Sequence, residues 1–415
     1  MRFRAYLVLC SLAVPACAQP AERRLVLVDV VSEALLRNPD VLAAQRRYEA
    51  TRQKPAQERT LPDPTVSIGW NSVKYPFPGA GLGKEVMSNI GAMFSQEVPY
   101  PGKLRLRALI ASKEADAEAQ QYRSTALGVV ARLKIAFYGL GHSYEVSDVL
   151  NRNRDALRSL LQVTEDRYAA GKAAQPDVFR AQTQLTLIEA RLAQTRLEAR
   201  TRSAEINSLL GRPATTPLAR PEQPHGAELE FTREELIAKA RDAAPSLLRE
   251  QQLIERGDSA LHLARKGSSP DFTLNGGFYT MGTMGELYEL RADIRLPRRS
   301  RVHAEIAQRS EELHAAQHSY EAAARTLEYK IEASYAAAET AQHLAELYQK
   351  TALPQARLTS ESSLLAYQSG SLDFLSVLSN YVAAFEYELN YHDQVHEFHM
   401  AVVRLEEVTG VELIQ

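Results

Sequence analysis

Four segments of the chain alternate apolar and polar residues, which is the period-two pattern of strands with two unlike faces. The alternation is visible at 65–70, where its phase slips near Asn71, and at 86–98, 271–278 and 288–296. We expect each strand to be about 10 to 12 residues long, which is the length that a tilted strand needs to cross the hydrocarbon layer of a membrane. The sequence therefore predicts two pairs of strands, each with an apolar face toward lipid and a polar face toward a lumen.

Long helical patterns follow each strand pair, with apolar residues at three- and four-residue spacing. Many of these positions are alanine, so neighbouring helices can approach closely and form a layer. The pattern from Pro297 to Gly370 covers ~70 residues, or about 105 Å. A single helical pattern at 233–266 would stack end to end with the shorter helix that ends at Gly410. The two stripes are Ala115, Ala119, Tyr122, Ala126, Val129, Leu133, Ala136 and Leu140, and Val178, Ala181, Leu185, Ile188, Leu192 and Ala199.

The chain repeats itself at an offset of about 200 residues, which indicates a duplicated structural unit. Each half has the pattern helix, strand, strand, long helix, turn, helix. Matching pairs are Asn38-Pro39 with Ala244-Pro245, Tyr168 and Gly171 with Tyr367 and Gly370, and Leu210-Gly211 with Thr409-Gly410. We expect a first repeat at 19–212, a proline-rich linker at 213–225 and a second repeat at 226–415.

The N-terminus reads as an export signal over residues 1–18. Arg2 and Arg4 precede a short apolar stretch, and Ala16-Cys17-Ala18 supplies a small-residue cleavage site. Two processing routes stay open: cleavage after Ala18, or lipoprotein processing with Cys17 as the acylated first residue.

Composition bounds the function further. With 415 residues, 45% hydrophobic and 24% charged, the chain is long and balanced enough to be ordered. Removing Arg2 and Arg4 changes the formal charge from −2 to about −4, which argues against a nucleic-acid partner. Both cysteines, Cys10 and Cys17, lie in the signal, so the mature chain forms no internal disulfide.

Beyond the signal no apolar run reaches ~18 residues, so a membrane crossing would have to be a β-barrel. Four strands cannot close such a barrel, since the smallest have about 8. Several chains would then contribute four strands each to one wall. The alternative is an ordinary antiparallel sheet with one wet face.

Candidate chemistry is sparse. No nucleophile elbow, phosphate loop or zinc-protease signature occurs, so we expect neither an enzyme nor a bound cofactor. His392, His396 and His399 share one helix face at three- and four-residue spacing and could bind a transition metal. Alternatively, they are polar residues of a helix seam or a lumen.

Taken in order, these motifs resemble the TolC family of outer-membrane efflux proteins over essentially the whole mature chain. They are the Asn38-Pro39 box, the entry Leu61-Pro62-Asp63-Pro64, the segment from Gln96 to Lys103, both Tyr-x-x-Gly segments and each half's closing segment, Leu210-Gly211 or Thr409-Gly410. The segment from Gln96 to Lys103 looks most like the heavy-metal branch, the CusC and CzcC type, which serves pumps of the resistance-nodulation-division class.

The resemblance implies a homotrimer whose twelve strands form a barrel in outer-membrane lipid, continued by a periplasmic tunnel of helices. The function implied is a passive exit duct for heavy-metal cations. A periplasmic adaptor and an inner-membrane pump of the resistance-nodulation-division class would be its partners. Adaptor contact is expected at the two helical tips, at Gly171, Lys172, Gly370 and Ser371.

In the family, acidic residues just after the second tip glycine narrow the periplasmic aperture. Those positions fall here on Ser376 and Ser379, a departure from the pattern. Asp373 lies within one turn and would either supply the acidic ring or cap the next helix.

Two other functions stay open. A drug-efflux or type I secretion duct would use the same body with a different pump. An exported coiled-coil adaptor or scaffold would have a small soluble sheet and would need no lipid-facing strand surface.

Overall fold

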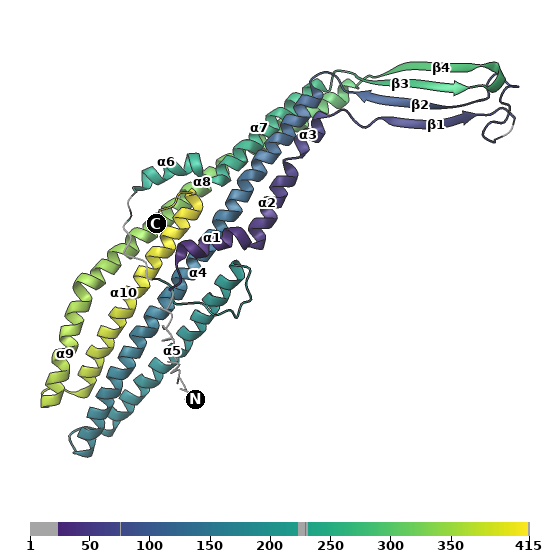
Figure 1. Ribbon diagram of the computed structural model, residues 1–415. Helices are drawn as coiled ribbons and strands as arrows, with labels where there is room; N and C mark the ends of the chain where they lie inside the picture. Colours follow the sequence, from purple (N-terminus) through teal and green to yellow (C-terminus); the bar gives the residue numbers. More distant parts are fainter. Residues whose placement is uncertain (1–23, 75, 223–228, 230, 414–415) are drawn as a thin grey trace, which may run out of the picture.

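A computed structural model describes residues 24–74, 76–222, 229 and 231–413. The predicted signal peptide and Cys17 lie outside these residues, as does part of the predicted linker. The molecule is elongated, with a four-stranded sheet at one end and two helical hairpins at the other (Figure 1). The expectation of a mainly helical chain with a small β part and four strands is confirmed.

The first half begins with three short helices, forms a strand pair and returns through a long helical hairpin. Its elements are α1 (Leu27–Arg37), α2 (Pro39–Thr51), α3 (Lys54–Arg59), β1 (Thr65–Asn71), β2 (Asn89–Val98), α4 (Lys103–Ala169) and α5 (Gln175–Leu209). Asn38 ends α1 and caps α2, because its side chain accepts hydrogen bonds from the backbone N–H of Asp40 and of Val41.

The second half follows the same order. Its elements are α6 (Arg233–Ala243), α7 (Pro245–Lys266), β3 (Asp271–Thr280), β4 (Glu286–Arg295), α8 (Arg299–Leu347), α9 (Leu353–Ser369) and α10 (Phe374–Thr409). The single helix expected at 233–266 is wrong, because the chain is extended at Ala244 and a new helix begins at Pro245. Proline disfavours helical geometry at the residue before it but suits the first helical position.

The sheet is antiparallel in the order β1-β2-β3-β4. Its register aligns alternate residues across all four strands: Val66 pairs with Phe94, Phe94 with Gly276, and Gly276 with Leu290. The expected alternation is therefore present, and one face carries exposed apolar side chains. They are Val66, Ile68, Trp70, Phe94, Leu274, Phe278, Tyr288, Leu290 and Ile294.

Two strand boundaries differ from expectation. β1 has 7 residues rather than about 10, and Val86 lies outside β2, in the loop before it. The ladder between β1 and β2 ends where Asn71 pairs with Asn89, and the chain between them forms bends and turns. Alternation alone could not locate this end, since Val86 continues the period of β2.

Toward the hairpins, the long helices form a layer in the order α9, α10, α4, α5 (Figure 1). Nearer the sheet, α7 packs between α4 and α8, so it extends the position of α10 along the rod as expected. The predicted seams are largely buried. Val129, Leu133, Ala136 and Leu140 form one core with α1 and the end of α5.

The long helix expected after Pro297 is present, but it contains one irregular turn. A π-helical turn at Tyr348–Ala352 separates α8 from α9. Pro354, the second residue of α9, cannot donate a backbone hydrogen bond to the preceding turn, and the wider turn accommodates it without ending the helix.

Candidate functional site

The first tip is the turn between α4 and α5. Gly171 ends α4 in the left-handed conformation, with φ of 70°. The backbone N–H of Lys172 donates to the carbonyl of Arg167 at 2.8 Å, which closes the helix end. Gly171 and Lys172 are both exposed, as a docking role at this tip would require.

The second tip, between α9 and α10, has the same geometry. Gly370 has φ of 85°, and the N–H of Ser371 donates to the carbonyl of Ala366 at 2.9 Å. Both residues are exposed. The structure therefore places all four predicted tip residues at the end of the rod away from the sheet (Figure 1).

Arg167 joins the two tips, a role that the sequence analysis missed. Its Nη1 donates to the carbonyl of Tyr367 at 2.7 Å and to that of Gln368 at 3.2 Å. Its guanidinium lies 4.6 Å from the centre of the Tyr367 ring. The carbonyl end of a helix attracts cations, so Arg167 holds the end of α9 against the end of α4. Arginine near a predicted helix end was the available signal.

Asp373 caps α10. Its Oδ1 accepts the backbone N–H of Ser376 at 2.9 Å, and its Oδ2 accepts the hydroxyl of Ser376 at 2.7 Å. These two bonds, the backbone one first, hold the pKa of Asp373 below its usual value. The capping interpretation is confirmed. Ser379 is exposed one turn farther along α10, and the aperture role of all three residues stays a prediction.

The three histidines of α10 meet side chains of α4. His392 Nδ1 lies 3.1 Å from Glu145 Oε2, and His396 stacks on His142 with ring centres 4.5 Å apart. His399 stacks on Tyr138 at 4.8 Å. A small cavity of about 50 Å³ lies between the helices at this level. Because each histidine contacts a different partner, they do not converge on one point.

A search for three or more His, Cys, Asp or Glu side chains placed to hold one metal ion finds none among the residues that the structure describes. The geometry therefore lends no support to the predicted metal site at His392, His396 and His399. It favours the alternative, polar residues within a helix seam.

Burial keeps two of these histidines neutral. It is the main cause that lowers the pKa of His396 and of His399 to about 4, and neighbouring charges modify it only secondarily. The Nδ1 atom of each is buried without a hydrogen-bond partner in the described part of the chain. Protonating either ring would place a charge in a poorly solvated seam.

We expect the fold to lose stability in mild acid through these two rings. The unfolded chain takes up protons near pH 6.5 and the folded chain only near pH 4, so stability present above pH 6.5 falls across this window. The loss is on the order of 3 kcal/mol per ring. In chemical unfolding at pH 7 and pH 4.5, His399→Phe should lose less stability than the unsubstituted protein. The exposed His318→Phe serves as the control, and an identical loss in all three would refute the assignment.

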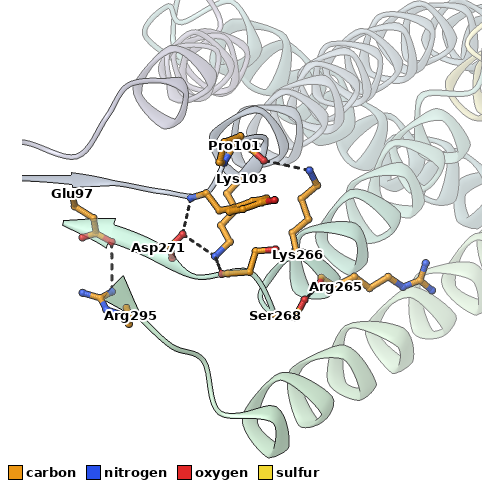
Figure 2. A network of polar contacts seen from close by, with 10 residues as sticks. Glu97, Pro101, Lys103, Arg265, Lys266, Ser268, Asp271 and Arg295 are labelled. Atoms are coloured by element: carbon orange, nitrogen blue, oxygen red, sulfur yellow. Dashed lines mark hydrogen bonds and ion pairs between the residues drawn. The ribbon is translucent and has the colours of Figure 1, made fainter. Parts of the chain in front are cut away.

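Buried polar contacts join the sheet to the helices (Figure 2). Lys103, the first residue of α4, is buried and donates to Asp271 Oδ1 at 2.8 Å and to the Ser269 carbonyl at 2.9 Å. The same Asp271 oxygen accepts the N–H of Tyr100 at 2.8 Å. Gly102 has φ of 90°, and a Cβ there would lie 2.6 Å from Lys266 Nζ. This explains the Gly-Lys pair in the segment from Gln96 to Lys103.

Comparison with known proteins finds one matching family and one curated relative. Residues 30–212 match the family described as "Outer membrane efflux protein". The outer membrane protein TolC of Vibrio cholerae is 25% identical over 258 residues, which are 61% of this chain and 57% of that relative. The family match covers less than half of this chain, and the chain spans 57% of the length of the curated relative.

Solved structures of outer-membrane channels share the fold. The VceC protein of Vibrio cholerae has a TM-score of 0.79 at 15% identity, covering 93% of this chain and 96% of that one. CusC has a TM-score of 0.76 at 13% identity, covering 93% and 92%. Since CusC is no more similar than VceC, the fold does not single out the heavy-metal branch.

In residues 24–413, apart from the short stretches left undescribed, no helix is long and apolar enough to cross a membrane.

Proposed function

We propose that this chain is an outer membrane efflux protein, a transport protein rather than an enzyme, which lies in the outer membrane with its helical portion in the periplasm. It would be the passive exit duct of a tripartite efflux system and would work as a homotrimer. Three copies would join their sheets into one twelve-stranded wall and their helical layers into one tunnel. The observation that carries the proposal is the sheet itself. Four strands align their exposed apolar side chains on one face, while the other face carries Asn275, Arg291 and Asp293.

The helical layer also favours a closed ring formed by several copies of the chain. Its two outer helices, α5 and α9, do not pack on each other within the described chain. Phe179 and Leu197 of α5 are 56% and 66% exposed, and Leu358 and Leu365 of α9 are 68% and 67% exposed. Single exposed leucines are common, but two apolar stripes on opposite edges of a layer favour edge-to-edge association.

We also propose that a periplasmic adaptor contacts the tips at Gly171, Lys172, Gly370 and Ser371, and that an inner-membrane pump supplies the energy. Asp373, Ser376 and Ser379 would face the aperture between copies. Heavy-metal cations are the proposed substrate, on the resemblance of the segment from Gln96 to Lys103 to the metal branch. A drug or protein substrate for the same body is the second candidate.

Fractionation followed by mass determination of the detergent-extracted particle tests the duct. A trimer in the outer membrane that conducts ions across a planar lipid bilayer without an energy source is the expected result. A monomer that stays soluble without detergent would instead identify an exported adaptor or scaffold. Sensitivity of a deletion strain to zinc, copper or cobalt, compared with dyes and detergents, separates the two substrate classes.

A further inference from the structure

Eight cationic side chains surround the junction between the sheet and the helices. They come from every segment that enters or leaves the sheet: the end of α3, the start of α4, the end of α7 and the start of α8. All but Arg107 are exposed. This basic collar consists of Arg59, Arg105, Arg107, Arg265, Lys266, Arg298, Arg299 and Arg301.

Most of the collar's charge is left without a counter-charge among the described residues, although Arg107 interacts electrostatically with Asp271. None of its members forms an ion pair with the residues that the structure describes, and Lys266 Nζ reaches only the Pro101 carbonyl, at 3.4 Å (Figure 2). The pairs at this level use other cations, since Lys103 binds Asp271 and Arg295 lies 3.5 Å from Glu97.

Few acidic side chains remain nearby to balance the collar. Glu58, Asp63 and Glu305 are the remaining carboxylates in the segments that carry it. Eight cations against three acids leave a clear excess of positive charge at one level of a chain whose overall formal charge is −2.

The apolar surface of the sheet ends where the collar begins. Ile294 and Leu296 are 56% and 76% exposed, and Arg298 follows Leu296 by two residues. Between α3 and β1, the exposed Leu61 likewise follows Arg59 by two residues. Apolar side chains bordered by long cationic ones match the boundary between acyl chains and headgroups in a bilayer.

We propose that the basic collar binds anionic phospholipid headgroups at the membrane surface on the periplasmic side of the sheet. The inference rests on the insertion of the sheet in the membrane. Contact between copies is the weaker explanation, because every copy brings the same excess of cations and a ring would concentrate it. The headgroup phosphate accepts hydrogen bonds from the planar fork of arginine, and seven of the eight collar residues are arginine.

The test compares lipid binding by matched charge variants. Arg298→Gln, Arg299→Gln and Arg301→Gln together remove three collar charges. Arg196→Gln, Arg200→Gln and Arg325→Gln remove three exposed arginines of the helical body that also form no ion pair in the described chain. Native mass spectrometry of the detergent-extracted full chain counts bound phosphatidylglycerol and phosphatidylethanolamine with identical acyl chains. Circular dichroism verifies that each variant is folded.

The unsubstituted protein should prefer phosphatidylglycerol, and the preference should weaken as salt rises. A cation near an anionic surface strengthens binding about fivefold. Phosphatidylglycerol binding should therefore weaken at least about tenfold in the collar triple variant and change little in the control triple variant. Equal binding of both lipids, or an equal loss in the control, would overturn the proposal. A collar variant that keeps its preference for phosphatidylglycerol but no longer forms a trimer would also overturn the proposal. The collar would then stabilise the contact between copies instead of binding lipid. A protein found outside the membrane fraction would count against the proposed duct instead.

Discussion

Lys134→Met should strongly destabilise the helical body of the protein. Lys134 of α4 and Glu406 of α10 form an ion pair of 2.7 Å, and both residues are buried. Glu406 also accepts the N–H of Leu413 at 2.8 Å. Removing one partner from a buried pair leaves an uncompensated charge, which costs about 3 to 5 kcal/mol. Chemical unfolding followed by circular dichroism measures the loss.

Two further variants isolate the cause. Lys134→Met combined with Glu406→Gln removes both charges and should recover part of the stability. Lys54→Met breaks an exposed pair between α3 and α4, Lys54 with Glu114 at 2.8 Å, and should cost no more than about 1 kcal/mol. A single Lys134→Met variant as stable as the Lys54→Met variant would contradict the account. The charge of Glu406, after burial, also helps raise the pKa of Tyr138 to about 12.

Leu358→Glu with Leu365→Glu should abolish the trimer and the efflux that depends on it. Both side chains lie exposed on the outer edge of α9, where a neighbouring copy is proposed to cover them. Replacing each leucine removes about 2 kcal/mol of stabilisation from the contact between two copies, because its apolar surface is no longer buried there. A closed ring of three copies loses this amount at each of its contacts. The particle mass after extraction and the drug or metal tolerance of a complemented strain give the readouts.

The opposite edge provides an independent check. A head-to-tail ring uses both edges in every contact, so Phe179→Glu with Leu197→Glu on α5 should have the same effect. Leu358→Met with Leu365→Met keeps the apolar surface and should leave the trimer intact. A trimer that survives either glutamate pair would exclude that edge from the contact between copies.

The strands and helix ends were predictable because each depends on a local rule. Alternation of side chains located the strands, and Gly171, Gly370 and Gly410 mark helix ends where a positive φ favours glycine. The break at Ala244 was also within reach, since Pro245 matches Pro39 of the first half. The repeat already pairs Ala244-Pro245 with Asn38-Pro39, but a single helical pattern was expected to run across this position.

The remaining features depend on contacts between distant residues. Three histidines on α10 are visible in the sequence, but His142 and Glu145, which decide their role, belong to α4 about 250 residues earlier. The repeats also differ where they match. Tyr168 is 46% exposed, whereas its counterpart Tyr367 is buried beneath Arg167. No local pattern distinguishes the two, because the arginine that covers Tyr367 comes from the other repeat.

The π-helical turn between α8 and α9 changes the heptad count of this long helix. Ile331 and Ala338 are buried seven residues apart, and so are Ala356 and Ser363 farther down. Ala338 and Leu353, both buried, are instead separated by 15 residues, two heptads plus one. The turn therefore inserts a single skip residue, which releases the accumulated supercoil twist at one level. The membrane-proximal and tip-proximal parts of the helix thus wind around their neighbours as two separate coiled-coil segments.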